Sequence, residues 1–495
     1  MILSREASLV SLVRDEEEEY DINVESLIES IKPEGRYQIW MVIYISLLSI
    51  NCAFMIYSVA FFFYVPEFQC FTDESKSNWT ICPETEACES KFGFGVLSSR
   101  TSLITEYSLY CDRGDIYVWA LSFMFYYNAI VAFFISLTVD SLGRKFAMLL
   151  SVGLTIVASG LGIVGNSLEI QVFAIANLFV AFDLFYNSST IWTVESIGGA
   201  LRHKANSIAY VAYGFGVAGF FVINSYLTSY DTIFWIIFCI ATVLLPAGLL
   251  FHESPAFLLK QGRISEMYEV ISKIARFNGT RFSRPELTAS GMKHEHRVDI
   301  TPFWVKFGKY KWVYACLTVI GANLSMLYSL ISLIPQFAGG KSMYVNGVLI
   351  AGVEIIGYGL ISTFASSWPR KKINLYGTCI FILGGASLFV SAKFWGRTGY
   401  ILYFELAVCL TITLALCITY GIFYTFAVES FPSSIRGKCL ASMVLLERFF
   451  CMLSGYFVRK GHLSNINPFS FITLTSIIPL IALLGLRETL GQRLL

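Results

Sequence analysis

Twelve long stretches of mostly apolar residues run along this chain and constrain its fold more than any other feature. A helix needs about 20 such residues to cross the hydrocarbon core of a membrane. The stretches lie near residues 40–64, 116–138, 146–166, 170–194, 207–228, 232–251, 311–335, 345–367, 373–393, 399–428, 439–458 and 467–486. They predict an all-α membrane protein with twelve transmembrane helices in two groups of six.

The composition agrees with a membrane protein and argues against several other classes. Of the 495 residues, 55% are hydrophobic and 14% are charged, whereas about 25% are charged in soluble domains. A net charge of +1 gives no basic field for nucleic acid. The five histidines are scattered, and there is no phosphate-binding loop or GxGxxG motif. We therefore expect no cofactor, no metal site, no ATP-driven pump and no enzyme, but a lipid bilayer and a small solute as partners.

Polar segments divide the chain into expected domains. Residues 1–39 contain the run RDEEEEYD and are interpreted as an acidic tail. A first six-helix half is expected at 40–251, with a polar loop at 65–115, and a second half with a short tail at 311–495. The loop at 252–310 separates the two halves. The short loops on the side of the N-terminus hold more Lys and Arg than the opposite loops, so both termini and the central loop are expected in the cytoplasm.

The first polar loop has the features of an extracellular segment. It holds four of the twelve cysteines, namely Cys70, Cys82, Cys88 and Cys111. In an oxidising compartment these would form two disulfides in one of three connectivities. The same loop carries the glycosylation sequon NWT at Asn78.

Three pairs of motifs indicate that the two halves are copies of one another. The pattern E-S-x5-R runs from Glu195 to Arg202 and again from Glu429 to Arg436, 234 residues later. At similar offsets ESP begins at residue 253 and ETLG at 488, and DSLGRK begins at 140 and SWPRKK at 367. Two parallel halves are the plan of a transporter that moves by rocking, with its substrate site at their interface near the bilayer midplane.

The charged residues of these motifs lie at the expected cytoplasmic ends of spans and predict a gating network. Its members are Asp140, Arg144, Lys145, Glu195, Arg202, Glu253, Glu429 and Arg436. Ion pairs among them can hold the halves together while the site faces outward. Each exposed pair contributes only ~0–1 kcal/mol, so a network is required. The alternative is that these charges only set the topology.

Four motifs, in the same order, resemble those of the organic ion transporters, a branch of the major facilitator superfamily. They are SLITEYSLYCD (102–112), DSLGRKF (140–146), ESPAFLLKQGRISEMYEVISKIARFNG (253–279) and ESFPSSIRGK (429–438). The resemblance implies the major facilitator fold, transport of small organic ions by alternating access, and the plasma membrane. Ser141 and Ala256 stand where the branch usually has Arg, and SWPRKK lacks the Asp and Gly of its counterpart. These departures leave open a transport-inactive relative that serves as a receptor or structural subunit.

A candidate substrate site centres on two charges inside the eleventh span, in MVLLERFFCML. Arg448 lies twelve residues beyond Arg436, a position where the family resemblance implies Arg in anion carriers, Asp in cation carriers, and a side chain facing the central cavity. Glu447 points about 100° away and is expected to orient Arg448 or brace the helix. Glu354, in the eighth span, is expected to neutralise Arg448 in the empty site. Tyr358, one turn after Glu354, stands where anion members often have Lys.

Two further residues complete the predicted site, and two substrate classes remain open. Asp183 lies in the fourth span, and Tyr328 falls at an aromatic position of the family's seventh span. Arg448 favours an organic anion, and a coupling ion is a further candidate partner. The alternative is an organic cation or zwitterion carrier built around Glu354, Asp183 and Glu447.

Overall fold

The structure is a computed structural model of the 495-residue chain. It describes residues 24–32, 34–72, 78–97, 100–282, 303–333, 335, 342–364, 367–394, 399–431, 433–464 and 466–489. Long helices occupy all twelve places where the sequence predicts a span. Those of the first half are α3 (Arg36–Tyr57, continued by α4, Val59–Phe62), α7 (Gly114–Leu142), α8 (Arg144–Val164), α9 (Leu168–Ser196), α10 (Gly199–Asn224) and α11 (Asp231–Leu249). Those of the second half are α14 (Phe303–Ile331), α16 (Met343–Phe364), α17 (Arg370–Phe394), α18 (Tyr400–Ser430), α19 (Ser433–Leu463) and α20 (Ile472–Gly485, preceded by η2, Pro468–Phe471).

Within the described residues, ten helices are long and apolar enough to cross a membrane, judged by length and composition. The helices α7 and α19 stand in the places of the second and eleventh spans. The helix α19 carries the charged residues Glu447 and Arg448 in its interior. The helical fold is thus as predicted, whereas the number of spans and the cytoplasmic termini stay predictions.

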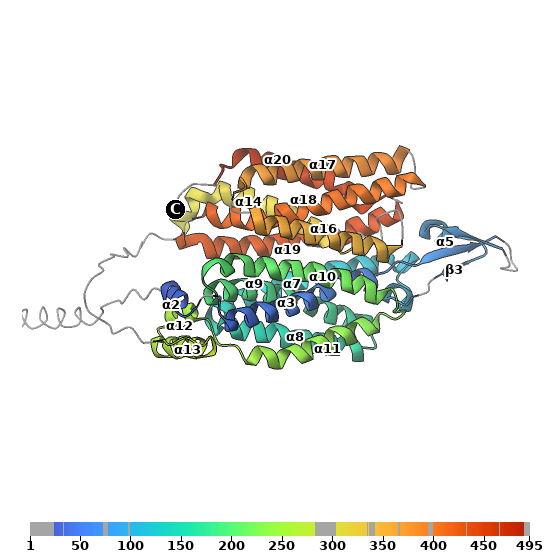
Figure 1. Ribbon diagram of the computed structural model, residues 1–495. Coiled ribbons are helices and arrows are strands. Elements are labelled where there is room, and N and C mark those ends of the chain that lie inside the picture. The colour runs from blue at the N-terminus through green and yellow to red at the C-terminus, as the bar shows by residue number, and fades with distance from the viewer. Residues whose placement is uncertain are drawn as a thin grey trace, which may run out of the picture.

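The long helices pack as two bundles that run side by side (Figure 1). The first contains α3 and α7 to α11, and the second contains α14 and α16 to α20. Along the boundary α19 packs against α7, and α10 packs against α16. Side chains on these four helices, and on the neighbouring α3, α9 and α14, are therefore placed where the two bundles meet.

The two ends of the molecule carry different small elements (Figure 1). One end, which we name the inner end, has α2 (Val24–Ser30), α12 (Pro255–Lys260) and α13 (Ile264–Phe277). The opposite end, named the outer end, has β1 (Glu67–Phe71), β2 (Trp79–Cys82), α5 (Glu84–Glu89), β3 (Phe94–Leu97), α6 (Leu103–Glu106) and η1 (Cys111–Arg113). The strands form an antiparallel sheet in the order β2-β1-β3, which the sequence analysis did not predict.

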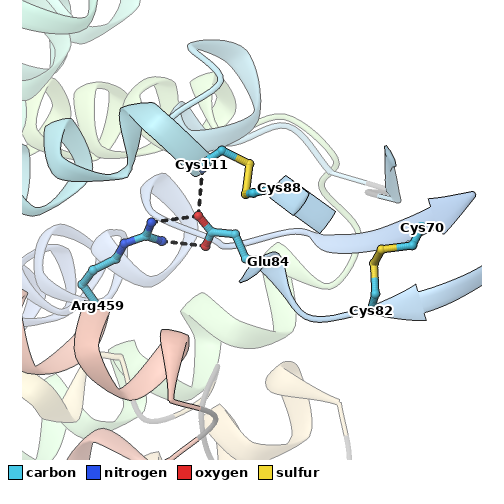
Figure 2. The surroundings of a disulfide bond; sticks show 6 residues. All are labelled: Cys70, Cys82, Glu84, Cys88, Cys111 and Arg459. Carbon is cyan, nitrogen blue, oxygen red and sulfur yellow. Dashed lines mark hydrogen bonds and ion pairs between the residues drawn. A yellow bond between two sulfur atoms is a disulfide. The ribbon is translucent and has the colours of Figure 1, made fainter. Parts of the chain in front are cut away.

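Two disulfides stabilise the small outer domain, as the four clustered cysteines predict. Cys70 of β1 is bonded to Cys82 of β2, and Cys88 of α5 is bonded to Cys111 of η1 (Figure 2). The structure thereby selects one of the three possible connectivities. Phe68 and Ala87 form a small apolar core beneath these bonds, separate from the main core of the helices. A domain this small cannot bury much apolar surface, so its crosslinks carry a large part of its stability.

Candidate functional site

Arg448 forms an ion pair across the boundary between the two bundles. Its Nη2 lies 2.7 Å from Oδ1 of Asp183 on α9. The other carboxylate oxygen, Oδ2, accepts a hydrogen bond of 2.9 Å from Nδ2 of Asn128 on α7. The Asp183 side chain is 5% exposed and that of Arg448 is 18% exposed. The pair is thus largely desolvated, but the guanidinium keeps some accessible surface.

The expected neutralisation of Arg448 by Glu354 is wrong. Glu354, on α16, is fully buried and its Oε1 accepts a hydrogen bond of 2.8 Å from the Tyr57 hydroxyl of α3. Its Oε2 has no hydrogen-bond partner among the residues that the structure describes. The reason lies in the packing: α19 packs on α7, with Asp183 of α9 nearby, whereas α16 packs on α10 beside α3. Arg448 and Glu354 therefore each find a partner in the first bundle.

Glu447 points into the second bundle, away from that boundary. Its side chain is buried, and its Oε2 accepts hydrogen bonds from the Ser325 hydroxyl of α14 at 3.1 Å and the Tyr424 hydroxyl of α18 at 3.0 Å. A Cβ atom on Gly321 of α14 would lie 2.1 Å from Oε1. This close approach requires the glycine. The placement favours a role in bracing α19 over a role in contacting substrate.

Six tyrosines form a chain from one bundle to the other, and Tyr424 at one end of it donates to Glu447. Hydroxyl pairs join Tyr210 to Tyr186 at 2.8 Å, Tyr328 to Tyr358 at 3.2 Å and Tyr420 to Tyr424 at 3.2 Å. Stacked rings join these pairs: Tyr210 and Tyr358 have centroids 5.5 Å apart, and Tyr328 and Tyr420 have centroids 5.2 Å apart. All six are partly exposed although they lie on inward-facing positions of α9, α10, α14, α16 and α18. Their rings and hydroxyls are suited to flat or amphipathic ions.

At the inner end of the first bundle, the predicted charges form one compact network. Nε and Nη2 of Arg144 donate to the two carboxylate oxygens of Glu195 at 3.0 and 3.1 Å. The Ser254 hydroxyl donates to Glu195 at 2.6 Å. Glu253 accepts hydrogen bonds from the backbone N–H groups of Arg144 at 2.9 Å and Lys145 at 3.1 Å.

Gly143 makes this arrangement possible. Its φ of +102° is one that residues with a side chain rarely adopt, and a Cβ there would lie 2.3 Å from Oε2 of Glu253. The glycine of the G-R-K motif therefore lets the Glu253 carboxylate reach the start of α8. This gives a physical reason for a glycine at that place in the motif.

The second bundle carries a copy of the same network. Nη2 of Arg370 donates to Glu429 at 3.1 Å, and the Thr489 hydroxyl donates to the other oxygen of Glu429 at 2.6 Å. Glu488 accepts hydrogen bonds from the backbone N–H groups of Arg370 at 2.8 Å and Lys371 at 3.1 Å. Each contact has its counterpart about 230 residues earlier, which supports the duplication inferred from the motifs.

These described ion pairs lie within each half, and the expected gating role of the network stays a prediction. Arg144 binds Glu195 within the first bundle, and Arg370 binds Glu429 within the second. The side chains of Asp140, Arg202 and Arg436 lie outside the described residues. Sequence reasoning did not include Arg370 and Glu488 among the network residues, although the repeat offset was a signal that could have found them. Asn128 and Tyr57 had no such signal.

Asn78 of the sequon NWT and Asn278 of the sequon NGT differ in exposure. Asn78 is exposed beside β2. In contrast, Asn278 is buried: its Nδ2 donates to Gln38 at 3.0 Å and its Oδ1 accepts from the Tyr37 N–H at 2.9 Å. Within the described part of the chain, no group of three or more His, Cys, Asp or Glu residues could hold a metal ion.

Comparison with known proteins identifies the family of the chain. The family model described as Major Facilitator Superfamily matches residues 111–455, well over half of the sequence. The chain belongs to this superfamily. The fold agrees, because a D-xylose–proton symporter has a TM-score of 0.63 at 14% identity, covering 93% of this chain and 100% of that one. The inward-open xylose transporter XylE from E. coli has a TM-score of 0.60 at 16% identity, covering 92% and 98%.

Curated relatives place the chain in the branch that its motifs resemble. The "Organic cation/carnitine transporter 2" of Rattus norvegicus is 24% identical over 426 residues, which cover 83% of this chain and 73% of the relative. The "Organic cation transporter protein" of Drosophila melanogaster is 24% identical, covering 83% and 75%. "Solute carrier family 22 member 21" of Mus musculus is 23% identical, covering 80% and 70%. The predicted membership in the organic ion transporter branch is confirmed.

Proposed function

We propose that this protein is a secondary-active or facilitative carrier of small organic ions in the plasma membrane, working by alternating access. We further propose that its substrate carries a positive charge, either as an organic cation or as a zwitterion. The sequence alone, through Arg448, favoured an anionic substrate, and this proposal differs from that expectation. The observation that carries the proposal is the 2.7 Å ion pair between Arg448 and Asp183.

The charge balance of the centre supports this choice. The Arg448 guanidinium is already matched by Asp183. Glu354 is buried with a tyrosine hydroxyl as its hydrogen-bond donor, and its other oxygen has no partner within the described part of the chain. An unmatched buried carboxylate costs several kcal/mol, and a cationic ligand would relieve that cost. The charged groups between the bundles therefore favour binding of a cation over binding of an anion.

The tyrosine rings support the same choice. Tyr328 and Tyr358, on α14 and α16, are partly exposed and have their hydroxyls 3.2 Å apart. Aromatic faces attract ammonium and quaternary ammonium groups by ~0.5–2 kcal/mol each. Two of the three relatives reported above are named as organic cation or organic cation/carnitine transporters. For a zwitterion, Arg448 would take the carboxylate while the ammonium group lies near Glu354.

An organic anion is the second candidate, and one observation favours it. The Arg448 side chain is 18% exposed, so an incoming carboxylate can approach it and displace Asp183. Guanidinium binds carboxylates and sulfates through a planar fork. The displaced Asp183 would keep its hydrogen bond from Asn128.

Uptake by purified protein in liposomes tests the proposal. We expect uptake of labelled tetraethylammonium and L-carnitine to exceed that of p-aminohippurate. Glu354→Gln should lower tetraethylammonium uptake about tenfold, equivalent to ~1.4 kcal/mol. Glu266→Gln, which removes an exposed acid of α13, serves as the matched control. Uptake of p-aminohippurate alone would establish the anion carrier, and no uptake by folded protein would favour a transport-inactive receptor or subunit.

A further inference from the structure

The outer domain is joined to the second bundle by a buried, two-point ion pair. Nη1 of Arg459, near the end of α19, donates to Oε2 of Glu84 at 2.6 Å, and Nη2 donates to Oε1 at 2.8 Å (Figure 2). The Glu84 side chain is 3% exposed and that of Arg459 is 13% exposed. Paired parallel hydrogen bonds of this kind are stronger and more directional than single ones. The contact is therefore a specific docking point and not a loose surface pair.

The surrounding structure is built to receive this guanidinium. Oε1 of Glu84 also accepts a hydrogen bond of 3.0 Å from the backbone N–H of Cys111, whose sulfur is bonded to Cys88 of the same helix as Glu84. A Cβ atom on Gly114, at the start of α7, would lie 1.9 Å from Nη2 of Arg459. The disulfide thus fixes the acid, and the glycine leaves room for the base.

The arginine of this pair lies on the same helix, α19, as the arginine of the central ion pair. Arg448 and Arg459 are eleven residues apart, which is three turns and about 16 Å along an α-helix. At 100° per residue they differ in direction by only about 20°. Both therefore point to the same side of α19, where Arg448 binds Asp183 of the first bundle and Arg459 binds Glu84 of the outer domain.

These contacts determine what must happen when the outer end opens. Glu84 lies in the segment that connects α4 with α7, two helices of the first bundle, whereas Arg459 belongs to the second bundle. Alternating access moves one bundle against the other around the central site. Separation of the bundles at the outer end must pull Arg459 out of its acceptor. Closure at that end must restore the pair.

We propose that Glu84 and Arg459 form the outer gate of the carrier, with the disulfide-bonded domain serving as the part that presents Glu84. The proposal rests on the proposed transport function, because it assigns the pair to one step of alternating access. The pair stabilises the state closed at the outer end. Loss of the pair shifts the equilibrium toward the state open at that end.

The test measures opening without requiring any substrate. Ser122 of α7 lies on the α7–α19 boundary, where its hydroxyl is 3.4 Å from the Met452 carbonyl of α19. A Ser122→Cys variant in whole cells would be labelled with a membrane-impermeant thiol reagent, and the parent with Ser122 gives the background. We expect Arg459→Met and the isosteric Glu84→Gln each to raise the labelling rate about fivefold or more. Lys460→Met, which removes the neighbouring exposed charge, should leave the rate unchanged.

The charge swap separates gating from a merely structural role. Glu84→Arg combined with Arg459→Glu restores an ion pair and should return the labelling rate toward that of the parent. Equal labelling of the parent, Arg459→Met and Glu84→Gln at equal surface abundance would overturn the proposal, as would a swap that labels as fast as the single variants. Because labelling needs no transported solute, a protein that carries neither cations nor anions would disprove the proposed function while leaving the gate measurable.

Discussion

Arg448 and Arg459 lie on one face of α19, three turns apart, and each binds an acid that belongs to the opposite side of the boundary between the bundles. The Arg448–Asp183 pair is at the predicted substrate site, and the Arg459–Glu84 pair is at the disulfide-bonded domain. A single rigid helix thus connects the two. Binding of a charged solute at Arg448 or Asp183 can therefore alter the contacts of the same helix at its outer end.

The first prediction concerns charge selectivity. Asp183→Asn removes the acid that matches Arg448 and should leave a guanidinium free to attract a carboxylate. We expect p-aminohippurate uptake to appear or to rise about tenfold, and tetraethylammonium uptake to fall. Asn128→Ala removes only a hydrogen bond to Asp183 and should have a smaller effect in the same direction. Unchanged selectivity in Asp183→Asn at normal surface abundance would mean that the pair is structural.

The second prediction concerns stability. Arg448→Met would leave Asp183 buried and unpaired, which costs about 3–5 kcal/mol. We expect a lower midpoint of thermal unfolding for the detergent-solubilised protein. The double variant Arg448→Met with Asp183→Leu removes both charges and should recover most of the loss. If the double variant is less stable than the single one, the pair contributes more than the cost of burying its charges.

The sequence predicts the frame of the molecule well because the frame depends on local hydrophobicity. Each predicted span coincides with a long helix, and the repeated E-S motifs mark equivalent networks. It does not predict which charges meet across the bundles. Arg448 has acids at 183 and 354 within the spans, and only the packing of α19 against α7 selects between them. Glu84 and Arg459 lie 375 residues apart in parts of the chain with no shared motif, so their contact has no sequence signal.

The third prediction concerns the close contact between α14 and α19. Gly321→Ala places a methyl group 2.1 Å from Oε1 of Glu447 and should destabilise the protein by about 1–3 kcal/mol. Glu447→Ala alone leaves the hydroxyls of Ser325 and Tyr424 without their acceptor. The combined variant gains room for the new methyl group, so its loss should be smaller than the sum of the two. A strictly additive loss in thermal-unfolding measurements would show that the two residues do not contact each other.

The fourth prediction concerns topology. Asn78→Gln should abolish a glycan-dependent shift in gel mobility, because Asn78 is exposed at the outer end. Asn278→Gln should leave the shift unchanged. It should still lower stability by about 1–3 kcal/mol, because the longer side chain cannot keep the contacts with Gln38 and the backbone of Tyr37. A shift that is lost only in Asn278→Gln would reverse the assignment of the outer and inner ends.

The last prediction uses the equivalence of the two inner networks. Ser254 and Thr489 both donate to the glutamate of the E-S motif, at 2.6 Å in each case. Ser254 has a second role, since its hydroxyl also accepts a hydrogen bond of 3.1 Å from the N–H of Phe257 and thereby caps α12. Ser254→Ala should therefore lower the free energy of unfolding by about 2 kcal/mol, because it removes both a hydrogen bond and a helix cap. Thr489→Val should lower it by only about 1 kcal/mol. Ser225→Ala, at an exposed position that bonds only its own helix, is the control. Equal losses for the two variants would show that capping of α12 contributes nothing, and a larger loss for Thr489→Val would contradict the equivalence of the networks.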